Sequence, residues 1–437
     1  MSIFDNLRNG VRDWLGLNDQ SAVSRYSEIE HNRAYASGEQ KKMLYVTPGK
    51  TDDNVTVNVI GLIVDRWVSW LFGREIEFDL PGEEDSQEQI YIDGVWDANK
   101  KSILLHKLGE NGTVAGTTYL KILDGEQPRL IAIDPKFVQI DTDPEDVESV
   151  IRYTISYTVG DYEIKEVSEL DNGKWTVTKV TKKGAWKTVE DLEWKYDFPP
   201  IAHCQNLPAI DSPYGIPDIT ASARKLQDSI NLVASNINKA NRLHSAPQLW
   251  GHNLNTFKEI DSGPNKIIDV GSTGDLNSLQ MSEMVGSSNF LQWLVKQLYV
   301  TTRTIDLDSL ADKLGALTNF GLRVLYEDTM TKLETKRSLY GDMLKEVNRR
   351  LLVIGGFSNT DPGDIHWEDV IPSNETEKVA SLQALKNLGV VSNETIAMQM
   401  GLDYAAEQDK IAKDKTSEGN IGAALLSAFN RSGNQIQ

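Results

Sequence analysis

Apolar residues recur at intervals of three and four along several stretches of the chain, a spacing that predicts amphipathic helices. The first stretch runs from Asn54 to a stop near Gly73, and its apolar positions are Ile60, Ile63, Val64, Trp67, Val68 and Leu71. A second helix is expected over residues 97–116. It carries the small-residue run Gly112-Thr-Val-Ala-Gly, which favours close packing against a neighbouring helix.

A longer helix is expected after residues 211–218, where two prolines and a glycine interrupt the pattern and Asp218 could cap the new helix. Its apolar seam is narrow: Ile219, Ala223, Leu226, Ile230, Val233, Ile237 and Ala240. The remaining faces are polar: Gln227, Asp228, Asn231, Ser235, Asn236 and Asn238. We therefore expect this helix to pack along one stripe and to leave much of its surface in water.

Helical periodicity resumes over residues 290–303 and again, in the longest stretch, over about 318–354. The seam of the longest helix is Leu322, Tyr326, Met330, Leu333, Tyr340, Leu344, Val347 and Leu351, and Gly355-Gly356 ends it. Its expected length is roughly 50 Å. A short strand near residue 365 should precede two C-terminal helices, one stopped by Gly389 and one begun by Ser392.

Short segments rich in β-branched and aromatic residues, separated by Gly, Asp and Asn turns, lie between residues 118 and 180 and predict a β region. Residues 246–288 hold short apolar pairs among Gly, Ser, Asn and Asp, which is typical of a hairpin or loop module. The expected fold class is α+β and mainly helical.

Composition narrows the classes of protein. A chain of 437 residues suggests two to four folding units of ~100–200 residues. With 45 Lys+Arg against 64 Asp+Glu the net charge is −19, which disfavours a general DNA-binding coat. No run approaches the ~20 apolar residues of a membrane span. The first 17 residues lack the apolar core of a secretory signal, and their amphipathic pattern predicts a short helical arm. The single cysteine, Cys204, is expected to be buried.

The candidate motifs for binding a cofactor or a metal are incomplete. Gly49-Lys50-Thr51 ends like a phosphate-binding loop, but Leu44 occupies the position of its first glycine. Asp306-Leu-Asp-Ser-Leu-Ala-Asp begins like a calcium loop without its turn glycine or terminal Glu, and residues 141–146 fail in the same way. His244 and His252 should lie in different elements. We expect no catalytic residue, cofactor or metal site. For Trp67, Trp70, Trp293 and Trp367 we expect packing in the core or at a subunit contact rather than stacking on nucleic acid.

Two stretches resemble the portal proteins of tailed bacteriophages, head-tail connectors of the siphophage type. Ser212-Pro-Tyr-Gly-Ile-Pro-Asp, followed by KLQDSINLVASNI, resembles the start of the family's stem helix. The segment from Ile365 through Leu388-Gly-Val-Val-Ser-Asn-Glu-Thr resembles the family's crown region. The order of elements matches the family over nearly the whole chain.

The resemblance implies a portal fold with a small α/β clip. Its regions would be an N-terminal arm at 1–24, an α+β wing at 25–213, stem helix 1 at 214–245 and the clip at 246–288. Stem helix 2 would follow at 289–303, a tunnel loop at 304–317, a long wing helix at 318–356, a helical crown at 357–415 and a flexible tail at 416–437. Here the chain departs from many relatives, because Gly315-Ala-Leu-Thr-Asn-Phe-Gly replaces their S-G-x-A stretch.

The resemblance also implies residues near DNA. Polar candidates in the tunnel loop are Asp306, Asp308, Asp312 and Lys313, and basic candidates on stem helix 1 are Arg224, Lys225, Lys239 and Arg242. A conduit should hold phosphate weakly, since every phosphate neutralised by Lys or Arg adds affinity and friction. A few basic residues would balance the acidic channel. The alternative for any one of them is a solvated or intersubunit ion-pair face.

The function implied is structural. A dodecameric ring at one capsid vertex would form the channel for packaging and ejecting double-stranded DNA. Expected partners are copies of the chain, weakly held DNA, the terminase large subunit, a head-completion adaptor, and the major capsid and scaffolding proteins, with no membrane. The expected location is the virion, after assembly in the host cytoplasm. The alternatives are a head-tail adaptor or another self-associating virion protein, and a packaging ATPase or nuclease, for which the required motifs are missing.

Overall fold

The computed structural model divides the chain into two compact units, Met1–Glu368 and Asp369–Gln437, and each is described by itself. The structure describes residues 20–49, 51–82, 86–244, 249–252, 275–278, 284–306, 319–368, 370, 375–400, 404, 407–408 and 410–411. Everything below concerns these residues.

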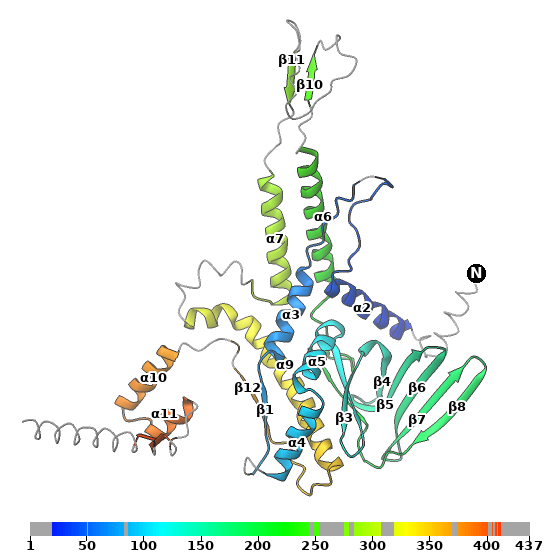
Figure 1. Ribbon diagram of the computed structural model, residues 1–437, viewed down its shortest axis with the longest axis vertical. Coiled ribbons are helices and arrows are strands. Elements are labelled where there is room, and N and C mark those ends of the chain that lie inside the picture. The colour runs from blue at the N-terminus through cyan, green and yellow to red at the C-terminus, as the bar shows by residue number, and fades with distance from the viewer. Residues whose placement is uncertain are drawn as a thin grey trace, which may run out of the picture. The chain divides into compact units, whose positions relative to one another are not determined.

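The first unit contains helices and antiparallel sheets, with more of its residues in helices than in strands, so the predicted α+β class is confirmed (Figure 1). Its helices are α2 (Gln20–Ser37), α3 (Val59–Phe72), α4 (Gln87–Ala98), α5 (Lys101–Ala115), α6 (Ala221–His244), α7 (Val285–Thr302) and α9 (Asn319–Ile354), with the 3-10 turn η1 (Pro135–Phe137). At ~1.5 Å per residue, the 36 residues of α9 span about 54 Å.

The largest sheet is an antiparallel meander of five strands in sequence order: β4 (Val138–Asp143), β5 (Asp146–Val159), β6 (Tyr162–Asp171), β7 (Lys174–Lys183) and β8 (Trp186–Leu192). A three-stranded sheet has the order β3 (Arg129–Ile133), β2 (Thr117–Leu123), β9 (Ile201–Gln205). Two pairs complete the set, β1 (Ile76–Asp79) with β12 (Asp364–Trp367), and β10 (Leu249–His252) with β11 (Asp275–Ser278). The hairpin chemistry expected in residues 246–288 agrees with the β10–β11 pairing, although most of that module lies outside the described residues.

One apolar core joins the meander to the three-stranded sheet. It consists of Tyr119, Val138, Ile140, Tyr153, Ile155, Trp175 and Ile201. These residues come from one face of β2, β4, β5, β7 and β9, since alternate residues of a strand face the same side. The far part of the meander, toward β8, has little buried surface.

A second core lies among the helices α3, α5 and α9. The small-residue run of α5 permits the close contact that the sequence predicted. A Cβ on Gly112 would overlap the hydroxyl of Tyr340 in α9, and one on Gly109 would press on Phe72 in α3. Trp96 of α4 is fully buried, and its indole N–H donates to Asn348 of α9 at 2.8 Å.

The helix predicted over residues 97–116 is present as α5, but it begins at Lys101 and not at Asp97. Two helices meet there, because Lys100 takes a left-handed conformation with φ of 56° and interrupts the helical path. The preceding helix, α4, was missed, although its start has a recognisable signal. Ser86 accepts a hydrogen bond from the Gln89 N–H, which is the Ser-x-x-Gln pattern of a helix N-terminus.

Residues on both sides of the segment 211–218 belong to the same compact unit, so the expected boundary there does not separate two units. The first strand of the expected crown, β12, pairs with β1 and also belongs to the first unit. In the second unit, α10 (Glu375–Asn387) and α11 (Asn393–Gln399) confirm the two C-terminal helices. Gly389 follows α10 with φ of 71°, and Ser392 caps α11.

Candidate functional site

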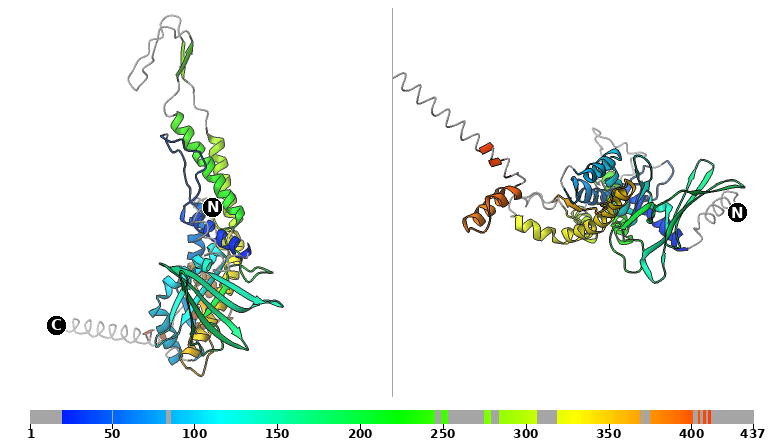
Figure 2. Two further views of the ribbon diagram at one scale, coloured as in Figure 1. Left: turned by 90° about the vertical axis from the view of Figure 1, so that its right-hand side faces the viewer. Right: turned by 90° about the horizontal axis from the view of Figure 1, so that it is seen from below.

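Two helices, α6 and α7, pack side by side and form what we call the helix pair (Figures 1 and 2). The buried residues Ala223, Ile230 and Ala234 of α6 lie on or beside its predicted seam. On α7 the buried residues include Leu294 and Leu298, one turn apart. Both helices lie where the sequence predicted them, within a few residues.

One face of α6 holds the extended segment that precedes α3 in the sequence. Four polar side chains, which we call the polar ladder, bind this segment: Gln227, Asn231, Ser235 and Asn238. The Ser235 hydroxyl accepts a hydrogen bond from the Val55 N–H at 2.9 Å and donates to the Val55 carbonyl at 3.4 Å. The Val57 N–H donates to the amide oxygen of Asn231 at 2.9 Å. Side chains therefore satisfy backbone groups that a neighbouring strand would otherwise bind.

The ends of the polar ladder follow the same scheme. The Gln227 amide oxygen accepts from the Ile60 N–H at 3.1 Å, and the Asn238 amide donates to the Asp53 carbonyl at 3.1 Å. Four residues of helix advance about 6 Å, and two residues of extended chain advance about 6.6 Å. Because these repeats nearly coincide, side chains spaced by four on α6 meet every second residue of the segment.

The expectation that the polar faces of α6 remain in water was wrong for three residues of the polar ladder, whereas Asn238 is exposed as expected. Gln227, Asn231 and Ser235 have relative exposures of 0%, 1% and 0%. Their partners lie about 170 to 180 residues earlier in the chain. Such partners cannot be predicted from hydrophobic periodicity, because periodicity depends only on which positions are polar and which are apolar.

A different face of α6 is exposed and carries two of the basic candidates for the channel. Lys225 and Lys239 lie on it, together with the exposed apolar residues Leu232 and Leu243. The other two basic candidates are engaged within the chain. Arg224 donates to the side-chain oxygen of Asn32.

Arg242 binds both carboxylate oxygens of Asp53, with N···O distances of 2.5 and 2.6 Å. Its guanidinium lowers the pKa of the Asp53 carboxyl. The contact extends the polar ladder by one more turn of α6. Arg224 and Arg242 thus bind α6 to earlier parts of the chain. Of the four basic candidates, only Lys225 and Lys239 have exposed side chains that make no hydrogen bond to the described residues.

The exposed side of α7 carries three large apolar side chains among polar residues such as Gln292 and Lys296. Phe290, Trp293 and Val300 are 49%, 52% and 61% exposed, and we call them the α7 stripe. The rings of Phe290 and Trp293 stack at a centroid distance of 5.7 Å. Contiguous exposed apolar side chains are candidates for a contact surface, and the stacked pair Phe290 and Trp293 is such a candidate. Trp293 therefore does not lie in the core, and its expected alternative, packing at a subunit contact, stays a prediction.

The base of the helix pair rests on three fully or almost fully buried charges, which we call the buried ion cluster: Asp218, Lys332 and Lys336. Lys332 Nζ lies 2.6 Å from Asp218 Oδ1, and Lys336 Nζ lies 2.6 Å from Oδ2. Asn206 donates to the same carboxylate at 3.0 Å. Burial raises the pKa of Asp218, but the attraction of the two lysines outweighs it and holds the pKa at about 2. Burial also lowers the pKa of Lys336 to about 8.

This cluster ties α9 to the start of α6, to α3 and to the end of α7. Lys332 donates to the Thr302 carbonyl at 2.6 Å, at the negative end of the α7 dipole. Lys332 and Lys336 lie 4.2 and 4.5 Å from the ring centre of Trp67, which adds a cation–π attraction to each lysine. The Trp67 indole N–H donates to the Thr304 hydroxyl at 2.9 Å.

The proposed capping role of Asp218 was wrong. Its carboxylate binds the lysines, and the Thr220 hydroxyl accepts from the Ala223 N–H at the start of α6 instead. One sequence signal points to the cluster. The apolar seam of the longest helix skips from Leu333 to Tyr340, and Lys336 occupies the missing position.

The chain leaves α7 toward the expected tunnel loop through an anchored segment. Arg66 donates to the Ile305 carbonyl at 2.8 Å, so the chain is held up to the residue before Asp306. The other loop candidates, Asp308, Asp312 and Lys313, lie outside the described residues.

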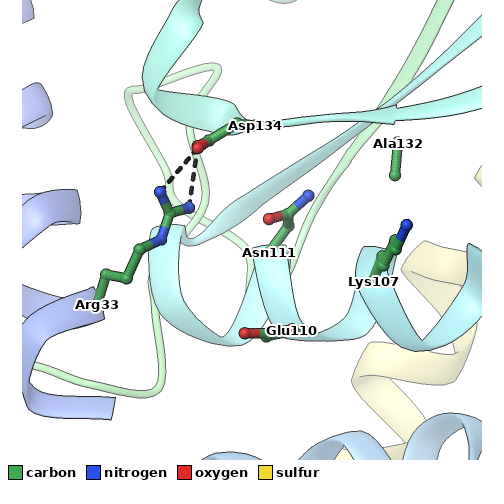
Figure 3. A pocket seen from close by; sticks show the side chains of 6 residues that line it. All are labelled: Arg33, Lys107, Glu110, Asn111, Ala132 and Asp134. Atoms are coloured by element: carbon green, nitrogen blue, oxygen red, sulfur yellow. Dashed lines mark hydrogen bonds and ion pairs between the residues drawn. The ribbon is translucent and has the colours of Figure 1, made fainter. Parts of the chain in front are cut away.

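An open pocket of about 260 Å³ lies between α2, α5 and the end of β3, and polar side chains line it (Figure 3). Arg33 binds both oxygens of Asp134 at 2.7 and 2.9 Å. This contact uses the two N–H donors at the edge of the guanidinium that a carboxylate or phosphate ligand would need. We therefore read the pocket as a packing contact between α2 and the β3–η1 turn.

Within the described residues, no group of three or more His, Cys, Asp or Glu side chains is arranged to hold a metal ion. Cys204 is buried as expected, and burial raises the pKa of its thiol. His244 ends α6 and His252 ends β10, so the two histidines lie in different elements. None of the helices in the described ranges is both long and apolar enough for a bilayer span.

Comparison with known proteins gives a family and several structural likenesses. Residues 21–420 match the family described as "Phage portal protein, SPP1 Gp6-like". Among solved structures, the neck of a native gene transfer agent particle, computed with C12 symmetry, is similar at 14% identity and a TM-score of 0.46. That likeness covers 79% of this chain and 89% of that one.

Two more solved structures are similar to this chain. The neck of the empty particle, computed with C6 symmetry, has 14% identity and a TM-score of 0.45 over 79% of this chain and 90% of that one. The virion of the native particle has 13% identity and a TM-score of 0.41 over 85% and 99%. A search of the curated proteins gave no match.

Proposed function

Because this chain belongs to the phage portal protein family, SPP1 Gp6-like, we propose that its copies close into a dodecameric ring at one capsid vertex. The coarser role follows from the family itself: the chain is a portal-type structural protein of a phage-like virion. The ring would form the channel through which double-stranded DNA is packaged and ejected. It would also dock the terminase motor and, later, the head-completion adaptors.

The observation that carries the ring is the α7 stripe. Phe290, Trp293 and Val300 expose apolar surface on a helix whose opposite side is already packed against α6. A ring with head-to-tail contacts needs a patch on one copy that meets a different patch on the next. The α7 stripe supplies the apolar patch of one copy for this contact.

The polar ladder and the buried ion cluster support this role by making the helix pair stiff. A helix in a ring wall must keep its direction while DNA moves past it. The ladder holds α6 along its length, and the cluster holds both helices at their base. We propose that Lys225 and Lys239 face the channel and partly balance its acidic charge, with Asp306, Asp308, Asp312 and Lys313 in the loop beyond α7.

A pair of variants of one residue tests the ring contact. Trp293→Glu places a charge in the proposed apolar contact and should leave a folded chain that no longer assembles, because about half of the Trp293 side chain is exposed to solvent in the single chain. Trp293→Phe keeps an aromatic surface and should still assemble. Light scattering reads the mass, and circular dichroism checks the fold. Equal assembly by both variants would contradict the role of the α7 stripe.

A further inference from the structure

A loop between α2 and α3 lies beside α6, and we call residues 39–49 and 51–54 the flanking loop. In two perpendicular views it lies on the side of α6 away from α7 (Figures 1 and 2). Both ends of the loop are bound to α6. At its start, Lys41 Nζ lies 2.6 Å from Asp228 Oδ2. At its end, the polar ladder and Arg242 bind Asp53, so α6 fixes the position of the loop.

The flanking loop is also closed by its own side chains. The Asn54 amide accepts from the Leu44 N–H at 2.7 Å and donates to the Leu44 carbonyl at 3.0 Å. Lys42 Nζ lies 2.5 Å from Asp52 Oδ2. Tyr45, in the apolar run Met43-Leu-Tyr-Val46, is nevertheless 88% exposed. A tyrosine in a fixed loop with its ring in water is typical of a contact surface, because aromatic residues and Met are enriched at the centres of protein interfaces.

Three faces of α6 set the direction of the flanking loop. Counted at about 100° per residue, the polar ladder, the exposed pair Lys225 and Lys239, and the apolar seam that packs on α7 follow one another at about a third of a turn. With the two lysines toward the channel, as proposed above, the loop lies toward one neighbour in the ring and α7 lies toward the other. A head-to-tail contact requires this arrangement of two different surfaces.

The heights of the two surfaces along the helix pair also match, which matters because all copies of a cyclic ring lie at one height. Lys332 binds both Asp218 and the Thr302 carbonyl, so the bases of α6 and α7 are at one level. Lys296 lies about 9 Å above the end of α7 at Thr302. Asp228, the partner of Lys41, lies about 10 Å above the start of α6.

The upper levels agree in the same way. Phe290 lies about 18 Å above the end of α7. Ser235 lies about 21 Å above the start of α6 and binds Val55, which follows Asn54, the residue that holds Leu44. Tyr45 is therefore near the height of Phe290, and the start of the loop is near the height of Lys296.

The charges at the lower level are complementary. Lys296 is the one charged residue of α7, and it is exposed. Glu39 is exposed at the start of the flanking loop, two residues before Lys41. Neither Glu39 nor Lys296 has an ion-pair partner among the residues that the structure describes. Each is thus available to a neighbouring copy.

We propose that the flanking loop is the surface that receives α7 of the neighbouring copy in the ring. In this contact Tyr45 packs on Phe290 and Trp293 of the neighbouring copy, and Glu39 binds Lys296 of that copy. The inference rests on the ring proposed above, and it names the second surface of the head-to-tail contact.

Photo-cross-linking in the full-length chain tests the contact. Tyr45 is replaced by p-benzoylphenylalanine, which should leave the fold intact because this side chain is almost fully exposed. Irradiated rings should give two-chain products in which residue 45 is joined to the tryptic peptide that ends at Lys296. The same replacement of Tyr162, an exposed tyrosine of the meander, is the control and should give no product with that peptide.

The outcomes of the cross-linking separate the loop contact from the ring itself. Rings that join residue 45 to a peptide outside α7, or that give no two-chain product, would overturn the loop contact and leave the ring in place. A chain that forms no rings would contradict both the loop contact and the proposed function.

A charge exchange tests the pairing of Glu39 with Lys296. Glu39→Lys and Lys296→Glu each place like charges in every contact of the ring, and each should raise the concentration for half-assembly about tenfold. An equal mixture of the two variants should assemble like the unmodified chain, because each contact between unlike copies again joins opposite charges. Light scattering measures the assembly.

The matched control is Glu126→Lys, at an exposed position of the turn between β2 and β3. It should assemble normally by itself and should not rescue Lys296→Glu in a mixture. Failure of the Glu39→Lys and Lys296→Glu mixture to assemble, or normal assembly of each of these variants alone, would overturn the proposed contact.

Discussion

Lys336 Nζ lies 2.6 Å from Asp218 Oδ2, and neither side chain has any exposure to solvent. Asp218 precedes α6, whereas Lys336 lies in the middle of α9, so the contact joins segments 118 residues apart. Two lysines share this one carboxylate, and its removal would leave two cations in the interior. The base of the helix pair therefore depends on a single acidic residue.

Replacing that residue should be costly. Asp218→Ala is expected to lower the free energy of unfolding by roughly 3–5 kcal/mol, because buried charges without a partner keep their full desolvation cost. Chemical denaturation followed by tryptophan fluorescence measures the loss. Asp364→Ala is the matched control, since Asp364 pairs with Lys345 at 2.8 Å on the surface and its loss should cost less than about 1 kcal/mol. Similar losses in both variants would show that the cluster does not hold the fold.

The polar ladder makes a local prediction. Asn231→Ala should lower the free energy of unfolding by about 1–3 kcal/mol, because it leaves the partly buried Val57 N–H without its partner. Hydrogen exchange at the amides of Val55 and Val57 should become faster. Asn236→Ala, on an exposed position of the same helix, should change neither quantity. Unchanged exchange in Asn231→Ala would mean that the segment is held by other contacts.

A buried histidine predicts how stability depends on pH. Burial, and next the charge of Arg350, lowers the pKa of His203 to about 4, whereas an unfolded chain titrates near ~6.5. Between these values the unfolded chain binds more protons than the folded one. The free energy of unfolding should therefore fall as pH drops from about 6.5 to about 4, by up to roughly 3 kcal/mol.

His203→Gln should remove this part of the pH dependence, and denaturation at pH 7 and pH 4.5 compares the two chains. His106→Gln, at an exposed position of α5, should keep the slope of the unmodified protein. If His203→Gln keeps the same slope, the acid sensitivity has another source.

The proposed channel residues predict an effect on DNA rather than on folding. Reversing both charges with Lys225→Glu and Lys239→Glu should leave rings intact but lower the amount of DNA packaged per particle, because the channel becomes more acidic. The ratio of absorbance at 260 and 280 nm of purified particles measures the DNA content. Lys174→Glu, exposed on β7, is the control for a charge change elsewhere. Equal DNA content in both sets would place Lys225 and Lys239 outside the channel.

Much of the helical architecture was predictable from the sequence. The seams of α3, α6, α7 and α9 follow from the spacing of residues such as Ile60, Ile230, Leu298 and Val347, which are buried as a regular periodicity requires. The strands β2, β3, β5 and β7 were also expected from their β-branched and aromatic residues. The strand β8, in contrast, was not predicted. It consists mainly of charged and polar residues and is almost fully exposed, so its sequence lacks the apolar alternation of a half-buried strand.

The contacts that position the helix pair were harder to predict, for a physical reason. Gln227 and Asn236 are both polar and lie on one helix, yet one is buried and the other exposed. What separates them is the extended segment around Val57, which lies far away in the sequence. Asp218 is a similar case. An aspartate at this position could either cap the start of α6 or bind distant lysines, and the sequence is the same for both roles. Only the tertiary partner decides between them.

The central claim is that this chain closes into a ring, and native mass spectrometry of the purified protein, with negative-stain imaging of the same sample, tests it most directly. We expect the mass of about a dozen subunits and images of rings with a central hole. A chain that remains a monomer or a dimer at every concentration, with no ring in the images, would contradict the account.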